Sequence, residues 1–123
     1  MGVQNPLEER IRKTVESSLR NWMLKSIILN KVSRKESYPY DFYKKLKEAD
    51  ISLFKGVKKS EVYNVFNSLE SKGLIKGEAK MSGKRMQREY AITKKGARVN
   101  AMIRRKMKKN IENIKMLMDY DSE

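Results

Sequence analysis

The segment from residue 57 to 93 constrains the fold of this chain more than any other part. A helical pattern at 60–72 ends at Gly73, and an apolar pair follows it. A basic, glycine-containing stretch at 81–88 then leads into the alternating run EYAIT at 89–93. Glycine commonly ends helices, and alternation of apolar and polar residues is typical of strands. The segment therefore predicts a helix, a strand, a basic turn and a returning strand.

This order of elements is that of the second half of a winged helix-turn-helix domain. In such a domain the helix enters a groove of DNA, and the hairpin, called the wing, reaches the phosphates beside it. We therefore expect a mainly α-helical fold with a small β-hairpin, its strands at 74–80 and 87–93 and its turn at Gly83. The helix has apolar residues at the spacing i, i+3, i+4, i+7, which predicts one buried face: Val62, Val65, Phe66 and Leu69.

Three more helices are predicted outside this segment. The first starts at Asn5, which can cap it, and continues to about residue 32. The second has Pro39 in its first turn. Residues 51–54 are predicted to form a short strand that pairs with the wing. The last helix follows Thr93, and its apolar residues are spaced by three and four, as in a coiled-coil seam.

The chain is expected to have four parts. They are an N-terminal helical extension (1–20), a winged-helix DNA-binding domain (21–93), a C-terminal dimerisation helix (94–119) and an acidic tail (120–123). The apolar stripe of the first helix needs a partner, either the last helix or a second chain. We expect a homodimer whose interface takes residues from both long helices: Leu7, Ile11, Val15, Val99, Ile103, Met107, Ile111, Ile114 and Leu117.

The charge of the chain favours a polyanionic partner. Lys and Arg number 29 and Asp and Glu number 15, so the net charge is +14. Eleven of the basic residues lie between Lys84 and Lys109, with Glu89 as the only acid among them. Clustered positive charge attracts nucleic acid at long range and gains affinity by releasing counterions.

Several classes of function are excluded by composition. The chain has no Cys and no His, so a disulfide, a thiolate zinc site, a thiol nucleophile or an imidazole base is impossible. The carboxylates form no pattern that indicates a catalytic pocket, and we expect no enzyme, cofactor or metal site. Charged residues interrupt the start of the chain, and no apolar run is long enough for a membrane span. We expect a cytoplasmic protein that acts on DNA.

The assembled motifs resemble those of the PadR-like transcriptional regulators over residues 22–101. YPYDFYKKL at 38–46 is similar to the opening of the family's second helix, and VKKSEVYNVF at 57–66 resembles its recognition helix, with Tyr63 at the signature tyrosine. LESKGLI at 69–75 matches its pattern, and the run from Gly83 to Gly96 resembles its wing and next helix start. The resemblance implies a dimer joined through the C-terminal helix, usually a repressor at palindromic operators.

The sequence departs from the family pattern at the expected points of DNA contact. Pro39 replaces a usual glycine, and Lys58-Lys59-Ser60 stands where small residues, proline and glycine are typical. Met86 lies in a wing tip that lacks the usual proline. The contacts with DNA are therefore expected to differ in detail from those of relatives.

The candidate DNA-binding residues lie on the third helix and the wing. Asn64 and Asn67, with Ser68 beside them, project from the helix, and asparagine can bond to both edge groups of adenine. Tyr63 is expected to be half-buried, with its hydroxyl near a phosphate. The remaining candidates lie at the helix start and at the wing, for minor-groove or phosphate contacts: Lys58, Lys59, Ser60, Lys84, Arg85 and Arg88. The alternative for each is a solvated polar surface.

Three functions remain open from the sequence. The first is a sequence-specific dimeric regulator bound to double-stranded DNA. The second is a non-specific architectural protein that coats DNA, which the charge supports equally well. The third is a winged helix used for protein contacts. A small-molecule effector is a further possibility, for which Trp22, Met23 and the methionines at 102, 107, 116 and 118 would line a pocket, although nothing else in the sequence supports one.

Overall fold

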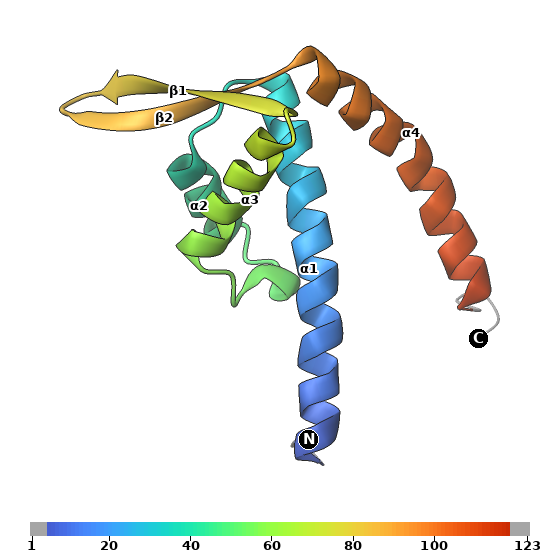
Figure 1. Cartoon of the computed structure of the whole chain (residues 1–123). Coiled ribbons are helices and arrows are strands. Elements are labelled where there is room, and N and C mark those ends of the chain that lie inside the picture. The colour runs from blue at the N-terminus through green and yellow to red at the C-terminus, as the bar shows by residue number, and fades with distance from the viewer. Residues whose placement is uncertain (1–4, 119–123) are drawn as a thin grey trace.

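The computed structural model describes residues 5–118 and confirms a winged helix-turn-helix (Figure 1). The fold is mainly helical, with one two-stranded antiparallel sheet in the described part of the chain. The elements follow one another in this order: α1 (Pro6–Arg34), α2 (Pro39–Glu48), the 3-10 helix η1 (Ser52–Phe54), α3 (Lys59–Ser71), β1 (Ile75–Ser82), β2 (Arg85–Ile92) and α4 (Lys94–Leu117). The predicted acidic tail at 120–123 lies outside the described residues.

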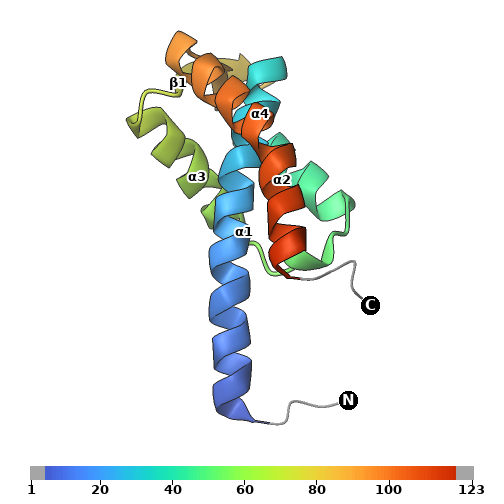
Figure 2. The same ribbon diagram turned by 90° about the vertical axis from the view of Figure 1, so that its right-hand side faces the viewer.

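Helix α1 is one continuous element of 29 residues, and it crosses position 20, where the extension was expected to end. The side chain of Asn5 caps it as predicted, accepting bonds from the backbone N–H of Leu7 (2.8 Å) and Glu8 (3.4 Å). Its buried residues all lie in the C-terminal half: Leu24, Ile28, Leu29 and Val32. The N-terminal half extends away from the domain, beyond the other elements (Figures 1 and 2).

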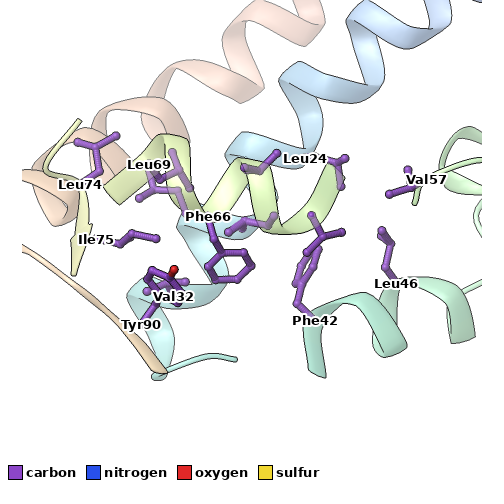
Figure 3. Close-up of a cluster of buried hydrophobic side chains, with 14 of the residues drawn as sticks. Leu24, Val32, Phe42, Leu46, Val57, Phe66, Leu69, Leu74, Ile75 and Tyr90 are labelled. Atoms are coloured by element: carbon purple, nitrogen blue, oxygen red, sulfur yellow. The ribbon is translucent and has the colours of Figure 1, made fainter. Parts of the chain in front are cut away.

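The core is built around Phe66 of α3, which is fully buried. Its ring meets Phe42 of α2 edge-on, with centroids 6.3 Å apart, and lies against Tyr90 of β2 at 5.0 Å (Figure 3). All four residues predicted for the buried face of α3 are in this core: Val62, Val65, Phe66 and Leu69. Each large apolar side chain buried in this way contributes about 1.5–3 kcal/mol, so the core fixes α3 against α1, α2 and the hairpin.

The hairpin is longer than predicted, because its strands continue to the tip. Ser82 pairs with Arg85, so only Gly83 and Lys84 form the turn. Gly83 has a φ of +64°, which the first central residue of a two-residue hairpin turn requires and glycine tolerates. The outer residues of both strands are exposed, so they show no apolar alternation that could have revealed them as strands.

The prediction of a strand at 51–54 was wrong. Residues 52–54 form η1, in which the N–H of Phe54 donates to the carbonyl of Ile51 at 2.9 Å. The apolar character of this run has another cause, since Phe54 is buried in the core. The backbone that pairs with the wing is instead Ser37, which exchanges two hydrogen bonds with Tyr90, at 2.9 and 2.8 Å.

Helix α4 is attached closely to the domain at its start. Thr93 caps it by accepting from the N–H of Gly96 at 3.0 Å, and its hydroxyl donates to the carbonyl of Gly73 at 2.7 Å. A Cβ at Gly96 would lie 1.9 Å from the carbonyl oxygen of Leu74, so only glycine permits this approach. The buried Asn100 then donates to Asn30 and Ser33 of α1. Beyond this contact α4 diverges from α1 (Figure 1).

Candidate nucleic-acid interface

A groove lies between α3, the start of α2 and the inner face of the wing. Here the wing means strands β1 and β2 with their turn. The walls of the groove are basic and aromatic: Tyr38, Pro39, Tyr40, Lys59, Tyr63, Asn67, Arg85, Met86, Gln87, Arg88 and Tyr90. Five of the predicted DNA-binding residues are therefore brought together in one concave surface.

Helix α3 contributes three residues spaced by four, which lie in line along the groove. They are Lys59, Tyr63 and Asn67. Tyr63 is 40 % exposed, in agreement with the expectation of a half-buried side chain. The Lys59 ammonium lies 5.3 Å from the centroid of the Tyr40 ring, a cation–π distance. This row gives the groove a cation, a phenol and an amide.

Asn67 is held in place by the wing. Its Oδ1 accepts a hydrogen bond from the hydroxyl of Tyr90 at 3.4 Å. An asparagine that pairs with adenine uses both its oxygen and its nitrogen. The bond to Tyr90 uses one of the two lone pairs of Oδ1 and orients the amide, whose N–H groups can donate to a base edge.

Asn64 lies on another side of α3. Together with Glu61 and Ser68 it lines a separate polar depression, whose opposite wall is α1. Both asparagines are exposed, and the spacing from Val62 and Phe66 alone places them on the same outer side. Only the packing of α1 and the wing on opposite sides of α3 separates them. The structure therefore places Asn67, and not Asn64, in the groove.

The start of α3 is exposed and basic, as predicted. Lys58, Lys59 and Ser60 are all exposed. The carboxylate of Glu61 accepts from the N–H of Lys58 at 3.5 Å, and it lies 3.6 Å from the guanidinium of Arg20 in α1. This contact ties the start of α3 to α1.

The wing has two kinds of basic residue. Lys84 in the turn and Arg85 beside it are exposed. Arg88 was predicted to contact DNA, but it lies within β2, in the predicted strand, and its guanidinium donates to Glu70 of α3 at 2.8 Å. Arg88 is therefore engaged by a carboxylate of its own chain, whereas the described residues show no ion pair for Lys84 or Arg85.

Glu70 is a residue of the site to which the sequence analysis gave no role. Its Oε2 accepts from Arg88 and also from the backbone N–H of Gly77 in β1, at 3.0 Å. The hydrogen bond from Arg88, followed by that from Gly77, lowers the pKa of Glu70. A Cβ at position 77 would lie 2.5 Å from Nε of Arg88, so glycine leaves the path open for the guanidinium. One carboxylate thus joins α3 to both strands of the wing.

A second carboxylate holds the outer face of the wing. Glu89 lies 3.1 Å from the ammonium of Lys80, and hydrogen bonds from Lys80 and from the hydroxyl of Tyr38 lower its pKa. With the backbone pair of Ser37 and Tyr90, this contact fixes the wing to the start of α2. The wing is therefore anchored on both faces.

The predicted dimer residues divide into two groups. Val99 and Ile103 pack against the core of their own chain. Ile103 also lines an apolar depression between α1 and α4, together with Met107, Ile111 and Ile114, and the remaining residues lie exposed along the two helices. Leu7, Ile11 and Val15 are 55–62 % exposed and Leu117 is 84 % exposed. The depression is lined mainly by apolar residues: Leu19, Trp22, Met23, Ile27, Met102, Ile103, Met107, Ile111 and Ile114.

The residues considered for an effector pocket are only partly assembled. Trp22, Met23, Met102 and Met107 line the depression. Met116 and Met118 are exposed near the end of α4 and do not line it.

Residues 5–118 lack two kinds of feature. This part of the chain contains no group of three or more acidic residues placed to hold a metal ion. None of its helices is both long enough and apolar enough to cross a bilayer.

Comparison with solved structures supports the fold. A PadR family transcriptional regulator from Eggerthella lenta has 22 % identity and a TM-score of 0.74, with 93 % of this chain and 97 % of that chain covered. A PadR-like transcription factor from Bacteroides fragilis has 24 % identity and a TM-score of 0.69, covering 85 % and 98 %. One from Bacillus cereus has 24 % identity and a TM-score of 0.65, covering 77 % and 90 %.

The sequence comparisons give a family but no curated relative. A search of curated proteins finds no significant match. The model of the transcriptional regulator PadR-like family matches residues 28–101, which include α2, η1, α3, both strands of the wing and the first part of α4. The chain therefore belongs to the PadR-like family of transcriptional regulators.

Proposed function

We propose that this protein is a sequence-specific regulator that binds double-stranded DNA as a homodimer and represses transcription from a palindromic operator. The observation that carries the proposal is the groove in which Lys59, Tyr63 and Asn67 of α3 face Arg85 and Arg88 of the wing. A helix and a basic hairpin on either side of one concave surface suit a major groove and the phosphate strand beside it.

Within this groove the residues have different tasks. Asn67 lies on the middle of α3 and donates to a base edge in the major groove. Lys58 and Lys59 at the helix start, and Lys84 and Arg85 at the wing tip, neutralise phosphates. Phosphate contacts position the protein, and the contacts to base edges provide specificity.

The dimer follows from the apolar surface of α1 and α4. The depression between them and the stripe of Leu7, Ile11 and Val15 are too apolar to suit a surface that stays in water. A second copy covers them and gives a two-fold axis. Two α3 helices related by that axis would occupy the two half-sites of a palindrome, about 34–36 Å apart on one face of the DNA duplex.

A selection experiment tests the proposal. Bound duplexes are enriched from a random pool, and the selected sequence competes with a scrambled duplex at fixed physiological salt. We expect a palindrome bound at least about 10³-fold more tightly than the scramble, with sedimentation showing a dimer. Equal affinities for both duplexes would refute sequence-specific binding.

A non-specific architectural protein is the second candidate. The observation that favours it is the basic surface of α4, where Arg104, Arg105, Lys108 and Lys109 are all exposed. This surface attracts any nucleic acid. Equal affinity in the competition, together with a steep dependence on salt, would select this function instead.

A further inference from the structure

Two methionines at the wing tip are exposed although the rest of the tip is polar. Met81 is 61 % exposed and Met86 is 65 % exposed, and they are direct cross-strand partners. The register places them next to the last pair before the turn, and this end of the hairpin projects beyond α2 and α3 (Figure 1). The core is therefore too far away to explain them.

The register shows which face the methionines occupy. Side chains alternate along a strand, so Met86 shares a face with Arg88 and Tyr90, and Met81 shares it with Gly77 and Ile75 across the sheet. This is the inner face, because Tyr90 and Ile75 are buried in the core and Met86 lines the groove. The pair thus places an apolar surface on the side of the wing turned toward α3.

The surroundings of the pair decide what can cover it. Lys84 and Arg85 are exposed next to it, and Arg88 follows it along the same face. An apolar protein partner would have to approach through this basic rim. Double-stranded DNA offers both properties required, because phosphates border the minor groove while sugar and base edges line it. Methionine is unbranched and adapts to irregular surfaces, and apolar side chains are used as wedges in minor grooves.

We propose that Met81 and Met86 together form an apolar contact with the sugar and base edges of the minor groove that flanks the major groove occupied by α3. The inference rests on the proposed DNA-binding function and adds a contact that contributes affinity without charge. It also makes the flanking sequence matter, because the exocyclic amino group of guanine obstructs the floor of the minor groove.

The test compares two double variants on the selected operator. Met81→Ala with Met86→Ala removes the apolar surface, and Met81→Leu with Met86→Leu retains it. Both sites are exposed, so neither double change should disturb the fold, and thermal unfolding of each variant is measured to check this. We expect the alanine variant to bind about tenfold more weakly at every salt concentration, with an unchanged salt slope, and the leucine variant to bind nearly as well as wild type. Lys84→Ala is the matched control, because it removes a charge at the same tip and lowers the slope by about one.

A second arm changes the DNA and leaves the protein intact. Replacing the flanking adenines with 2,6-diaminopurine adds an amino group to the minor groove and leaves the major-groove pattern unaltered. This change should weaken the wild type several-fold and leave the alanine variant unaffected. If the wild type binds the operator but neither the alanine substitutions nor diaminopurine changes the affinity, the inference is overturned while the proposed function stands. A lowered salt slope in the alanine variant would also overturn it. If the wild type binds no DNA at all, the proposed function fails and the inference fails with it.

Discussion

Glu70 provides the sharpest test of how the wing is held against α3. Its carboxylate accepts from Arg88 at 2.8 Å and from the backbone N–H of Gly77 at 3.0 Å. Replacing Glu70 with Ala removes both bonds. We expect the wing to be held less firmly against α3 while the core around Phe66 and the bonds between Ser37 and Tyr90 stay intact.

The expected loss in the free energy of unfolding follows from how exposed the side chains of Glu70 and Arg88 are. Glu70 is 27 % exposed and Arg88 is 50 % exposed, so solvent reduces the ion pair to about 0.5–1 kcal/mol. The bond from Gly77 adds about 1 kcal/mol. The free energy of unfolding should therefore fall by about 1–2 kcal/mol in Glu70→Ala. Urea unfolding measures it, and Glu48→Ala, which removes an exposed acid at the end of α2, is the control for lost charge.

The pH dependence of this difference has a definite sign. The folded state lowers the pKa of Glu70 from its ordinary value of 4.5, so the carboxylate stabilises the fold fully above that value. The stabilisation is lost as the pH falls through the lower, folded-state pKa. The difference between wild type and Glu70→Ala should therefore be constant near neutral pH and shrink below about pH 4.5.

The variant also separates positioning from charge in DNA binding. Removing an acid raises the net charge by one, so affinity for scrambled DNA should hold or rise slightly. Affinity for the selected operator should fall several-fold, because Arg88 loses its bond to α3 and the wing keeps only the anchor on its outer face. Unchanged unfolding and an unchanged ratio of the two affinities would refute the assigned role of Glu70.

Three further predictions concern specificity, salt and assembly. Asn67→Ala should lose about 1–3 kcal/mol of binding free energy on the operator and much less on scrambled DNA, and Asn64→Ala should lose less than Asn67→Ala on the operator. Competition binding measures both losses. Equal losses for the two variants would contradict the placement of Asn64 outside the groove. Operator affinity of the wild type should fall about 10³–10⁵-fold between roughly 50 and 200 mM salt if about 6–10 phosphates are neutralised; a flat salt titration would show that the basic groove is not the binding surface. Replacing Ile111 and Ile114 with Asp should give monomers in sedimentation at micromolar concentration, and a wild type that is already monomeric would end the dimer proposal.

The sequence alone predicted the features whose residue pattern depends directly on burial or on local chemistry. Val62, Val65, Phe66 and Leu69 have the period of a helix buried on one face, and all four are buried. Asn5 has the chemistry of a cap and acts as one. The same reasoning was wrong for residues 51–54, because a short apolar run does not distinguish a strand from a single helical turn that buries one phenylalanine.

The candidate site was less predictable, because it depends on contacts between distant segments. Arg88 was predicted to be a DNA-binding residue of the wing. Its bond to Glu70 was not predicted, because it joins residues 18 positions apart. The separation of Asn64 from Asn67 depends on where α1 and the wing lie around α3. The spacing of apolar residues in α3 does not indicate these positions. The bond from Tyr90 to Asn67 spans 23 positions, and no local pattern indicates it.

The junction before α4 connects the candidate site to the surface proposed for the dimer. Thr93 ends the wing and caps α4, while its hydroxyl bonds to the carbonyl of Gly73, which ends α3. Lys95 adds a bond from its ammonium to the carbonyl of Lys72, at 2.9 Å, and Gly96 brings α4 against Leu74. The end of α3, the base of the wing and the start of α4 are thus bonded to one another within a few residues. A rotation of α4 about a dimer axis would therefore move the groove with it, so the packing of α4 in the proposed dimer would set the distance between the two grooves.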